Sequence, residues 1–454
     1  MNGWTWGNGT YEVRTYDQDG KISQVDGSGL KTYGYDDAFR IIGIADTVNS
    51  AFSWTYGYDA LDRLSSASAT GQSQSFTYDA TGNRLTQGGT LSSTYTVSAG
   101  SNRLSSVTGA PTRIYAYDVA GNATGDGARS FTYNNAGRMT SLTNGAVITS
   151  YAFNALGERV KKSSPLSTTY FVYDEAGHLI GEYNAAGNIV EETVWMGDIP
   201  VATLQFGTSA LKTYYVHTDH LNTPRRITNR NTNIIVWRWD SDPFGNGAAV
   251  QNPPGSVTVS YNLRYPGQYF DSETGLFYNY FRDFDPAVGR YVESDLIGLD
   301  GGINTYAYAL GNPISLVDSR GLDAWVIINN NGWWGTHAGL YVDSGERALY
   351  DPGGSYRDAE KGSGDALYGS YADISDYIKY EKQDGPDVEV FHFPTTPQQD
   401  KQIIDKIQQQ GGCQPLFCTV CVSRVLRGIG PFKNLGLSRT PAGLARDLRA
   451  LQKK

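Results

Sequence analysis

One short motif recurs along the first half of the chain. It consists of an aromatic residue, Asp or Asn, two or three variable residues that often include Gly, a polar residue and an apolar residue. Several successive copies begin roughly 20 residues apart, and a fixed period of this kind is typical of repeat architectures. The copies begin at Tyr16, Tyr35, Tyr58, Tyr78, Tyr117, Tyr133, Phe153, Tyr173 and Tyr183.

Each copy of the motif predicts a tight turn between two strands. The aromatic residue ends one strand and packs inward. Asp-x-x-Gly then forms the turn, because Asp bonds the backbone ahead of it and Gly accepts a positive φ. A single hairpin cannot bury its own apolar face, so the hairpins must stack on their neighbours. We therefore expect a mainly β fold in which the repeated Asp and Asn residues form turns and not a metal site.

Composition agrees with strands and argues against several classes of protein. The 454 residues include 53 Gly and 32 Tyr, which favours strands and turns over helices. The net charge of −9 argues against a general nucleic-acid binder, which is usually basic. The sequence has no apolar run that could span a membrane and no secretory signal peptide at its start. Its three cysteines allow at most one disulfide.

The repeats and the segments after them resemble the YD repeats and the repeat-associated core of Rhs proteins. The core-like segments begin YYVHTDHLNTPRRITN at Tyr214, WDSDPFGNG at Trp239 and RYPGQYFDSETGLFYNYF at Arg264. The resemblance implies YD repeats over residues 1–200, a core with an autocleavage motif over 201–322, and a C-terminal toxin over 323–454. It further implies a shell of β-strands around a hollow that encloses the toxin. The repeats are too few for a full shell and begin in mid-pattern, so we expect the distal piece of a longer protein.

The same resemblance implies that the shell cuts the chain at the end of its core. Rhs proteins use two aspartates for this, and the matching residues are Asp295 in GRYVESD and Asp318 in PISLVDSRGL, with Arg282 as a supporting arginine. The scissile bond follows Leu322. Two carboxylates held close together cannot both ionise, so one keeps a proton and acts as the acid while the other acts as base or orients water. Ser319 stands where the family usually has Pro, which loosens the turn that presents the bond.

The tail, residues 323–454, predicts a small α+β unit. HAGLYV, from His337, alternates like a strand, and residues 347–351 read as its return strand. If Gly345 takes the left-handed position in the loop, residue 342 pairs with 346, and His337 falls opposite Asp351. TTPQQDKQIIDKIQQQGG and CTVCVSRVLRG read as helices. Cys418 lies in the first turn of the second helix, where partial positive charge favours a thiolate.

This strand and the cysteine helix together resemble circularly permuted NlpC/P60 enzymes, which are papain-like cysteine hydrolases. HAGLYV is similar to the family's His-x-Gly strand, and CTVCVSRVLRG to its cysteine helix, in the reversed order of permuted members. The resemblance implies Cys418 as nucleophile, His337 as base and Asp351 as the residue that orients the imidazole. Permuted members often have Asn before the nucleophile, where this chain has Phe. This departure leaves Cys421 open as the nucleophile, and His392 is the alternative base.

The cysteines also allow three other interpretations. A zinc site formed by Cys413, Cys418, Cys421 and His392 has suitable ligand types, but its spacing is not that of a standard zinc knuckle. A Cys-x-x-Cys redox pair would want a thioredoxin-like βαβ pattern, which is absent. The cysteines could also simply fill a core. We expect no metal and no cofactor.

These patterns predict a fragment of an Rhs polymorphic toxin. Its shell encloses and autoproteolytically releases a cysteine hydrolase-like effector (an amidase or peptidase, a deamidase or an acyltransferase) used against competing cells. The expected partners are a cognate immunity protein, a secretion apparatus or delivery protein, and target-cell peptidoglycan, protein or lipid, but no nucleic acid. We expect production in the bacterial cytoplasm and secretion or delivery into target cells without a classical signal peptide. The alternative is a non-enzymatic surface repeat protein that binds carbohydrate or cells.

Overall fold

The computed structural model divides the chain into two compact units, Met1–Gly321 and Leu322–Lys454. It describes residues 2–452 except 207–209, 297, 299–302, 319–323, 332–336, 343–347, 353–355, 357–365, 369–371, 373, 386, 394, 396 and 414–416. The first unit carries the repeats and the segment after them, of which residues 239–318 are called the core segment. The second unit carries the tail. The further division of the first unit near residue 200 stays a prediction.

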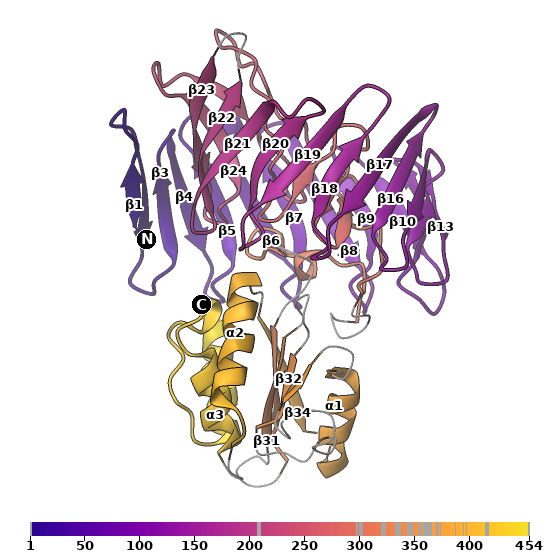
Figure 1. Ribbon diagram of the computed structural model, residues 1–454, viewed down its shortest axis with the longest axis vertical. Helices are drawn as coiled ribbons and strands as arrows, with labels where there is room; N and C mark the ends of the chain where they lie inside the picture. Colours follow the sequence, from indigo (N-terminus) through magenta and orange to yellow (C-terminus); the bar gives the residue numbers. More distant parts are fainter. Residues whose placement is uncertain are drawn as a thin grey trace. The chain divides into compact units, whose positions relative to one another are not determined.

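The first unit is built from two large antiparallel sheets in which each strand pairs with the next one along the chain. Figure 1 shows the first sheet in indigo and violet behind the second, which is drawn in purple and magenta. The prediction of a mainly β fold is confirmed. The first sheet contains β1 (Gly3–Thr5), β2 (Tyr11–Tyr16), β3 (Ile22–Asp26), β4 (Leu30–Tyr35), β5 (Ile41–Asp46), β6 (Trp54–Tyr58), β7 (Leu64–Ala69), β8 (Gln72–Tyr78), β9 (Arg84–Gly89), β10 (Ser93–Val97), β11 (Leu104–Gly109) and β12 (Arg113–Ile114).

The second sheet continues the same meander and leads into the core segment. It contains β13 (Ala116–Tyr117), β14 (Ala123–Gly125), β15 (Arg129–Tyr133), β16 (Met139–Asn144), β17 (Val147–Phe153), β18 (Arg159–Ser163), β19 (Thr168–Tyr173), β20 (Leu179–Asn184), β21 (Ile189–Met196), β22 (Ile199–Phe206), β23 (Leu211–Thr218), β24 (Pro224–Asn229) and β25 (Ile235–Arg238). The core segment adds a small sheet of β26 (Tyr269–Phe270), β27 (Phe277–Asn279), β28 (Arg282–Asp285) and β29 (Arg290–Tyr291).

Asp59 shows how the motif makes its turn. Its backbone N–H donates to the carbonyl of Arg63 at 2.9 Å, and its Oδ1 accepts the backbone N–H groups of Leu61 and Arg63 at 2.9 and 3.0 Å. Asp79 repeats this pattern, and Gly82 in its turn has a φ of 87°. These aspartates therefore form turns, as the sequence predicts.

In several copies the tyrosine of the motif also ties the repeat to an earlier part of the chain. The Tyr58 hydroxyl donates to the backbone carbonyl of Ile41 at 2.7 Å, and Ile41 is the apolar residue that closes the preceding copy of the motif. Tyr78 likewise donates to the carbonyl of Leu64 at 2.9 Å. The sequence predicts only the inward packing of the ring, so the hydroxyl contact is new. Further pairs are Tyr35 with Ile22, Tyr117 with Leu104, Tyr133 with Ala123 and Tyr173 with Arg159.

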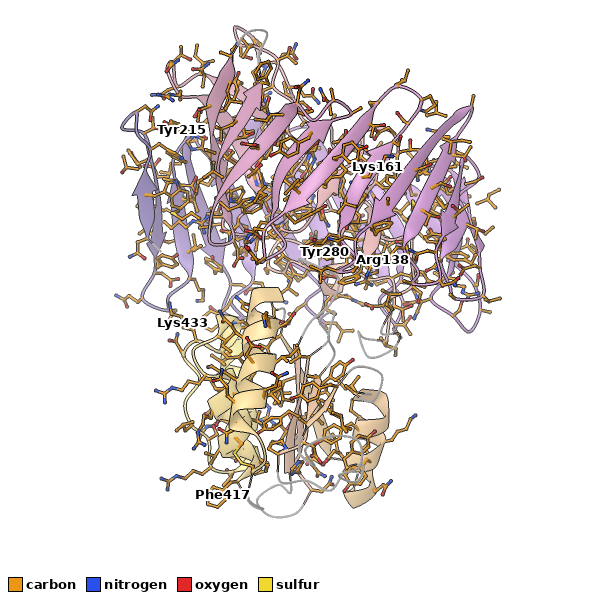
Figure 2. The ribbon with its side chains drawn as sticks, in the orientation of Figure 1. Arg138, Lys161, Tyr215, Tyr280, Phe417 and Lys433 are labelled. Carbon is orange, nitrogen blue, oxygen red and sulfur yellow. A yellow bond between two sulfur atoms is a disulfide. The ribbon has the colours of Figure 1, made fainter. Side chains whose placement is uncertain are left out.

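The core segment, residues 239–318, packs against the inner faces of both sheets. Phe244 belongs to a buried cluster with Phe76 of β8, and Leu276 to another with Phe131 of β15. The buried guanidinium of Arg159 lies 2.5 Å from Asp271, which joins β18 to the core segment. A second contact between a sheet and the core segment joins Arg138, just before β16, to Tyr280, and Figure 2 labels both residues. The resemblance implies a hollow inside the shell. In this chain the core segment packs against the inner faces of the sheets and fills that space.

The second unit is a five-stranded antiparallel sheet with helices on both faces. The order across the sheet is β33-β32-β31-β30-β34. In Figure 1, α2 and α3 lie on one face and α1 on the other. The strands are β30 (Ala324–Asn329), β31 (His337–Val342), β32 (Ala348–Tyr350), β33 (Ala366–Tyr368) and β34 (Val388–Phe393), and the helices are α1 (Ile374–Glu381), α2 (Pro397–Gln410), α3 (Cys418–Leu426) and α4 (Pro441–Gln452).

Residues from β31, α2 and α3 share one buried core in this unit. Leu340 of β31, Ile403 of α2 and Val422 of α3 all lie in it. Both helices that the tail sequence predicts are present, and Cys418 is the first residue of α3. Among the described residues, no helix is long and apolar enough to cross a membrane.

Candidate functional site

His337 is the first residue of β31, and the register of this strand with β32 differs from the expected one. Val342 pairs with Ala348, whereas the sequence predicted a pairing of 342 with 346, and Gly345 lies outside the described residues. A shift of two residues keeps every side chain on the same face of the sheet. Asp351 therefore becomes a diagonal neighbour of His337, which long side chains can still reach.

Asp351 follows β32, and three hydrogen-bond donors hold its carboxylate. Nε2 of His337 lies 2.5 Å from Oδ1, and the hydroxyl of Tyr377 donates to the same oxygen at 2.8 Å. The backbone N–H of Tyr356 donates to Oδ2 at 3.1 Å. The carboxylate is buried, so its orientation is set by these contacts. Because Nε2 of the imidazole faces Asp351, Nδ1 is the ring nitrogen that remains for another partner.

Cys418 supplies that partner from the start of α3. Its side chain is only 5% exposed, and it lies close enough to the His337 ring to raise the pKa of that ring. The first N–H groups of a helix have no partner within the helix, so they place partial positive charge near the sulfur. The structure thus brings Cys418, His337 and Asp351 together. Their catalytic roles stay a prediction.

The pKa of His337 is raised to about 10 in this environment. Burial lowers the pKa, but the hydrogen bonds and negative charges of Asp351 and Cys418 outweigh that effect. The site therefore favours the imidazolium form at neutral pH.

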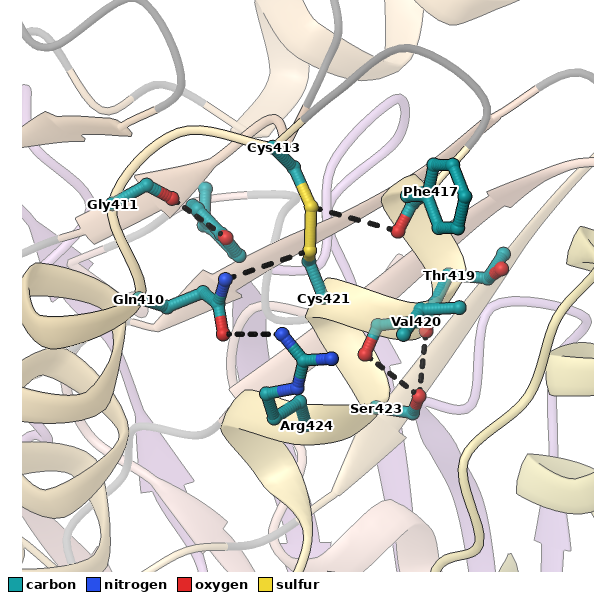
Figure 3. Close-up of a disulfide and its surroundings, with 10 residues drawn as sticks. Gln410, Gly411, Cys413, Phe417, Thr419, Val420, Cys421, Ser423 and Arg424 are labelled. Carbon is teal, nitrogen blue, oxygen red and sulfur yellow. Dashed lines mark hydrogen bonds between the residues drawn. A yellow bond between two sulfur atoms is a disulfide. The ribbon is translucent and has the colours of Figure 1, made fainter.

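Cys413 and Cys421 are joined by a disulfide, which Figure 3 shows beside the start of α3. Cys418 is the cysteine that remains free. In this state Cys421 is not a thiol, and Cys418 is the residue that can act as a nucleophile. The same bond removes two ligands from the zinc interpretation. His392 lies in β34, where its backbone pairs with residue 325, and its side chain lies outside the described part.

The sequence analysis missed two residues of α1 that complete the surroundings of His337. Tyr377 is fully buried and donates to Asp351, and Glu381 accepts a hydrogen bond from Asn329 at 2.9 Å. Burial raises the pKa of Glu381. One atom each of His337, Asp351 and Glu381 lie within 4.8 Å of one another, so these three could hold a metal ion. The sequence feature that could have pointed to Tyr377 is the glycine of His-x-Gly. This residue, Gly339, has no side chain and so leaves room for the Tyr377 ring.

The residues that match the Rhs cleavage site also meet, in the first unit. Nη1 of Arg282 lies 2.8 Å from Asp295, and Nη2 lies 3.1 Å from Oδ2 of Asp318. Tyr291 donates to that same oxygen at 2.9 Å. Arg282 is buried in β28, so its cation serves both carboxylates away from water. Leu322 and the Ser that replaces Pro in the motif lie outside the described residues.

The family model of the teneurin YD-shell matches residues 33–308, which is more than half of the chain. The chain belongs to the teneurin YD-shell family. The prediction of a YD-repeat shell is thereby confirmed. The YD-shell match ends before the tail and does not test the likeness of the tail to permuted NlpC/P60 enzymes.

Curated relatives of this YD-shell chain are named as toxins. The double-stranded DNA deaminase toxin A of Burkholderia cenocepacia is 29% identical over 335 residues, which are 65% of this chain and 23% of that protein. The toxin protein Tse5 of Pseudomonas aeruginosa is 39% identical over 109 residues, 24% of this chain and 8% of that protein. The tRNA nuclease WapA of Bacillus subtilis is 28% identical and covers 56% of this chain. The chain spans under a quarter of each of these relatives.

Solved structures show the same shell fold. The crystal structure of TcdB2-TccC3-TEV has a TM-score of 0.58 at 18% identity and covers 70% of this chain and 18% of that one. The pore structure of the Photorhabdus luminescens Tc holotoxin has a TM-score of 0.56 at 18% identity, with the same coverage. At this identity the likeness concerns the fold of the YD shell.

Replacing Gly339 by Ala is expected to destabilise the second unit. A Cβ at Gly339 would lie 2.6 Å from Cε1 of Tyr377 and would push this ring away from Asp351. We expect a loss of about 1–3 kcal/mol in the free energy of unfolding, as for other overpacked sites. This free energy is measured by unfolding the full chain in urea, with cleavage of the second unit by a protease as the readout of its unfolding. The control is Gly436→Ala, where a Cβ meets no atom within 4 Å. Equal stability of the two variants would contradict the packing of Tyr377 on β31.

Proposed function

We propose that this chain is part of an Rhs-type toxin, in which the YD shell carries a cysteine hydrolase formed by residues 323–454. The observation that carries the proposal is the position of His337, whose ring contacts both Asp351 and the free thiol of Cys418. A base held between a carboxylate and a nucleophile is the arrangement of papain-like enzymes. The likeness of HAGLYV and CTVCVSRVLRG to permuted NlpC/P60 enzymes supports the same assignment.

The proposed reaction begins with attack of the Cys418 thiolate on the carbonyl carbon of an amide or ester. The His337 imidazolium, held in place by Asp351, then gives its proton to the leaving amine or alcohol, and an acyl-enzyme remains. Water, deprotonated by the neutral imidazole, attacks the acyl group and restores the thiolate. In this proposal, backbone N–H groups in the first turn of α3 donate to the developing oxyanion and stabilise it. No metal takes part in these steps.

The substrate is an acyl group in peptidoglycan, in a protein side chain or in a lipid. A nucleic-acid base is a weaker candidate, although two relatives are named for action on DNA and tRNA. Zinc deaminases use a His-x-Glu motif with two cysteine ligands. None of the five histidines of this chain is followed by Glu at the second position. Two of its three cysteines are bonded to each other.

We further propose that the shell cuts the chain after Leu322. One of the carboxyls Asp295 and Asp318 orients a water molecule for attack on the carbonyl carbon of Leu322. The other gives a proton to the amine as the C–N bond breaks. Arg282, which contacts both, holds them in place. The expected partners are an immunity protein, which protects the producing cell, and a secretion apparatus or delivery protein.

Replacement of the nucleophile or the base is expected to abolish toxicity. Cys418→Ser and His337→Ala should each lower kcat/KM by about a thousandfold or more, because the two residues act as a unit. The full chain is expressed in bacteria with and without a secretion signal, and growth is followed. The purified protein is then given sacculi, glutamine-containing peptides and phospholipid vesicles, with the products identified by mass spectrometry.

The matched control is Arg427→Ala, which changes an exposed residue directly after α3. It should leave toxicity and turnover unchanged. If Cys418→Ser and His337→Ala remain as toxic as the wild type, the hydrolase assignment is wrong.

The raised pKa of His337 predicts a specific pH dependence of stability. A proton held with a pKa of about 10, against 6.5 for an ordinary histidine, stabilises the folded state. This contribution is complete below pH 6.5 and is lost as the pH rises through 10. The unfolding free energies of wild type and His337→Gln should therefore differ most below pH 6.5 and converge as the pH rises through about 10. A difference that grows with pH would show that the imidazolium is not the favoured form.

Self-cleavage is tested on the same full chain. We expect a denaturing gel of the purified wild type to show two fragments, with Asp323 as the new N-terminus of the smaller one. Asp318→Asn and Asp295→Asn should stay intact, whereas Asp62→Asn, at an exposed turn, should be cut like the wild type. An uncut wild type, or a cut Asp318→Asn variant, would refute the assignment.

A further inference from the structure

The disulfide lies at the start of α3, beside the candidate nucleophile Cys418. It connects Cys413, in the segment after α2, to Cys421, which is one turn into α3. Cys418 is located between them, at the first position of the helix. The bond and its surroundings are drawn in Figure 3.

The first turn of α3 is buried, but no side chain caps it. Its N-cap residue, Phe417, makes no capping side-chain hydrogen bond, and the Phe417 side chain is 52% exposed. Helices normally begin on a residue whose side chain bonds the free N–H groups of the first turn. Here a main-chain bond from Cys421 to Phe417, at 3.0 Å, closes the first turn. The disulfide adds the covalent tie that the missing cap does not provide.

The rest of the helix is anchored independently of the disulfide. Val422, Val425 and Leu426 are buried in the common core of the unit. Upstream, the Tyr350 hydroxyl donates to the carbonyl of Gly411 at 3.0 Å. Breaking the disulfide should therefore leave the unit folded while it releases Cys413 from α3 and loosens the start of that helix at Cys418. The contact between Cys418 and His337 would then be lost, because Cys418 lies at the first position of α3.

The positions of the cysteines confine disulfide formation and reduction in this chain to the tail. All three cysteines belong to the tail, and the first 412 residues contain none. The shell thus folds in the same way in reducing and oxidising surroundings. Disulfides persist in the periplasm and outside cells, whereas cytoplasmic thiols are kept reduced.

We propose that the Cys413–Cys421 disulfide assembles the catalytic site, so that the hydrolase is active only in an oxidising compartment and its substrate lies in the cell envelope. In the producing cytoplasm the two thiols stay reduced and the nucleophile is misplaced. A disulfide-bearing thiol oxidase then takes two electrons and two protons from them, the S–S bond forms, and the oxidant becomes a dithiol. This proposal rests on the hydrolase assignment and narrows its substrates to envelope components such as peptidoglycan.

The first experiment needs no substrate, and it compares oxidised and reduced full chain. Thiol counting in denaturant should find one thiol before treatment with dithiothreitol and three after it. Alkylation of Cys418 by iodoacetamide, followed by mass spectrometry of its peptide, reports how the thiol is held beside His337. We expect this rate to fall by about tenfold on reduction, because the thiol then loses its contact with the ring.

The variant Cys413→Ser with Cys421→Ser is the matched control for the reductant. It should alkylate at Cys418 as slowly as the reduced wild type, and dithiothreitol should not change its rate. Circular dichroism should show the same helix content in both forms. Equal alkylation rates in the oxidised and reduced wild type, or a single state with three thiols, would overturn the proposal.

The second experiment separates this proposal from the hydrolase assignment. The full chain, with or without a secretion signal, is expressed in bacteria that have or lack their periplasmic thiol oxidase. Toxicity should require both the signal and the oxidase, and both Cys418→Ser and the double Ser variant should remove it. If Cys418→Ser is harmless but the double variant kills like the wild type, the redox proposal fails and the hydrolase stands. If Cys418→Ser still kills, the hydrolase fails, and the alkylation rates alone decide whether the disulfide orders Cys418.

Discussion

The first unit depends on a hydrogen bond that crosses from one repeat to an earlier one. The tyrosine of the motif donates its hydroxyl to a backbone carbonyl at the end of a preceding copy, as Tyr58 does to Ile41 and Tyr78 to Leu64. The ring buries apolar area, and the hydroxyl satisfies a carbonyl that the turn would otherwise leave unpaired. A single hairpin has no such partner. Because each such contact needs a preceding copy, neighbouring repeats stabilise one another.

The core segment uses the inner faces that this array creates. Its carboxylates meet cations that the strands supply, as Asp271 meets Arg159 of β18. Arg282, within the core segment itself, joins Asp295 and Asp318. Buried charges of this kind are costly unless they are paired, so each pair also selects one arrangement of the core segment. The end of the first unit is thereby held at the residues that match the cleavage site.

In the second unit, His337 is the residue on which the candidate chemistry depends. Its ring is reached by Asp351 after β32 and by Cys418 of α3, while Tyr377 of α1 holds the carboxylate. The charges around the ring keep a proton on it. Each of these contacts comes from a different element, and the disulfide ties the start of α3 to the segment after α2.

The sequence by itself determined the features that depend on near neighbours. Asp-x-x-Gly specifies a turn, the apolar stripe of CTVCVSRVLRG specifies a helix with Cys418 in its first turn, and the His-x-Gly pattern singles out His337. Only the tertiary structure decided the pairing of Val342 with Ala348, the contact of Tyr377 with Asp351, and the choice of Cys413 as the partner of Cys421. Loop length, helix packing and the choice among three nearby thiols depend on how the whole unit closes its core, and the local pattern in the chain does not decide them.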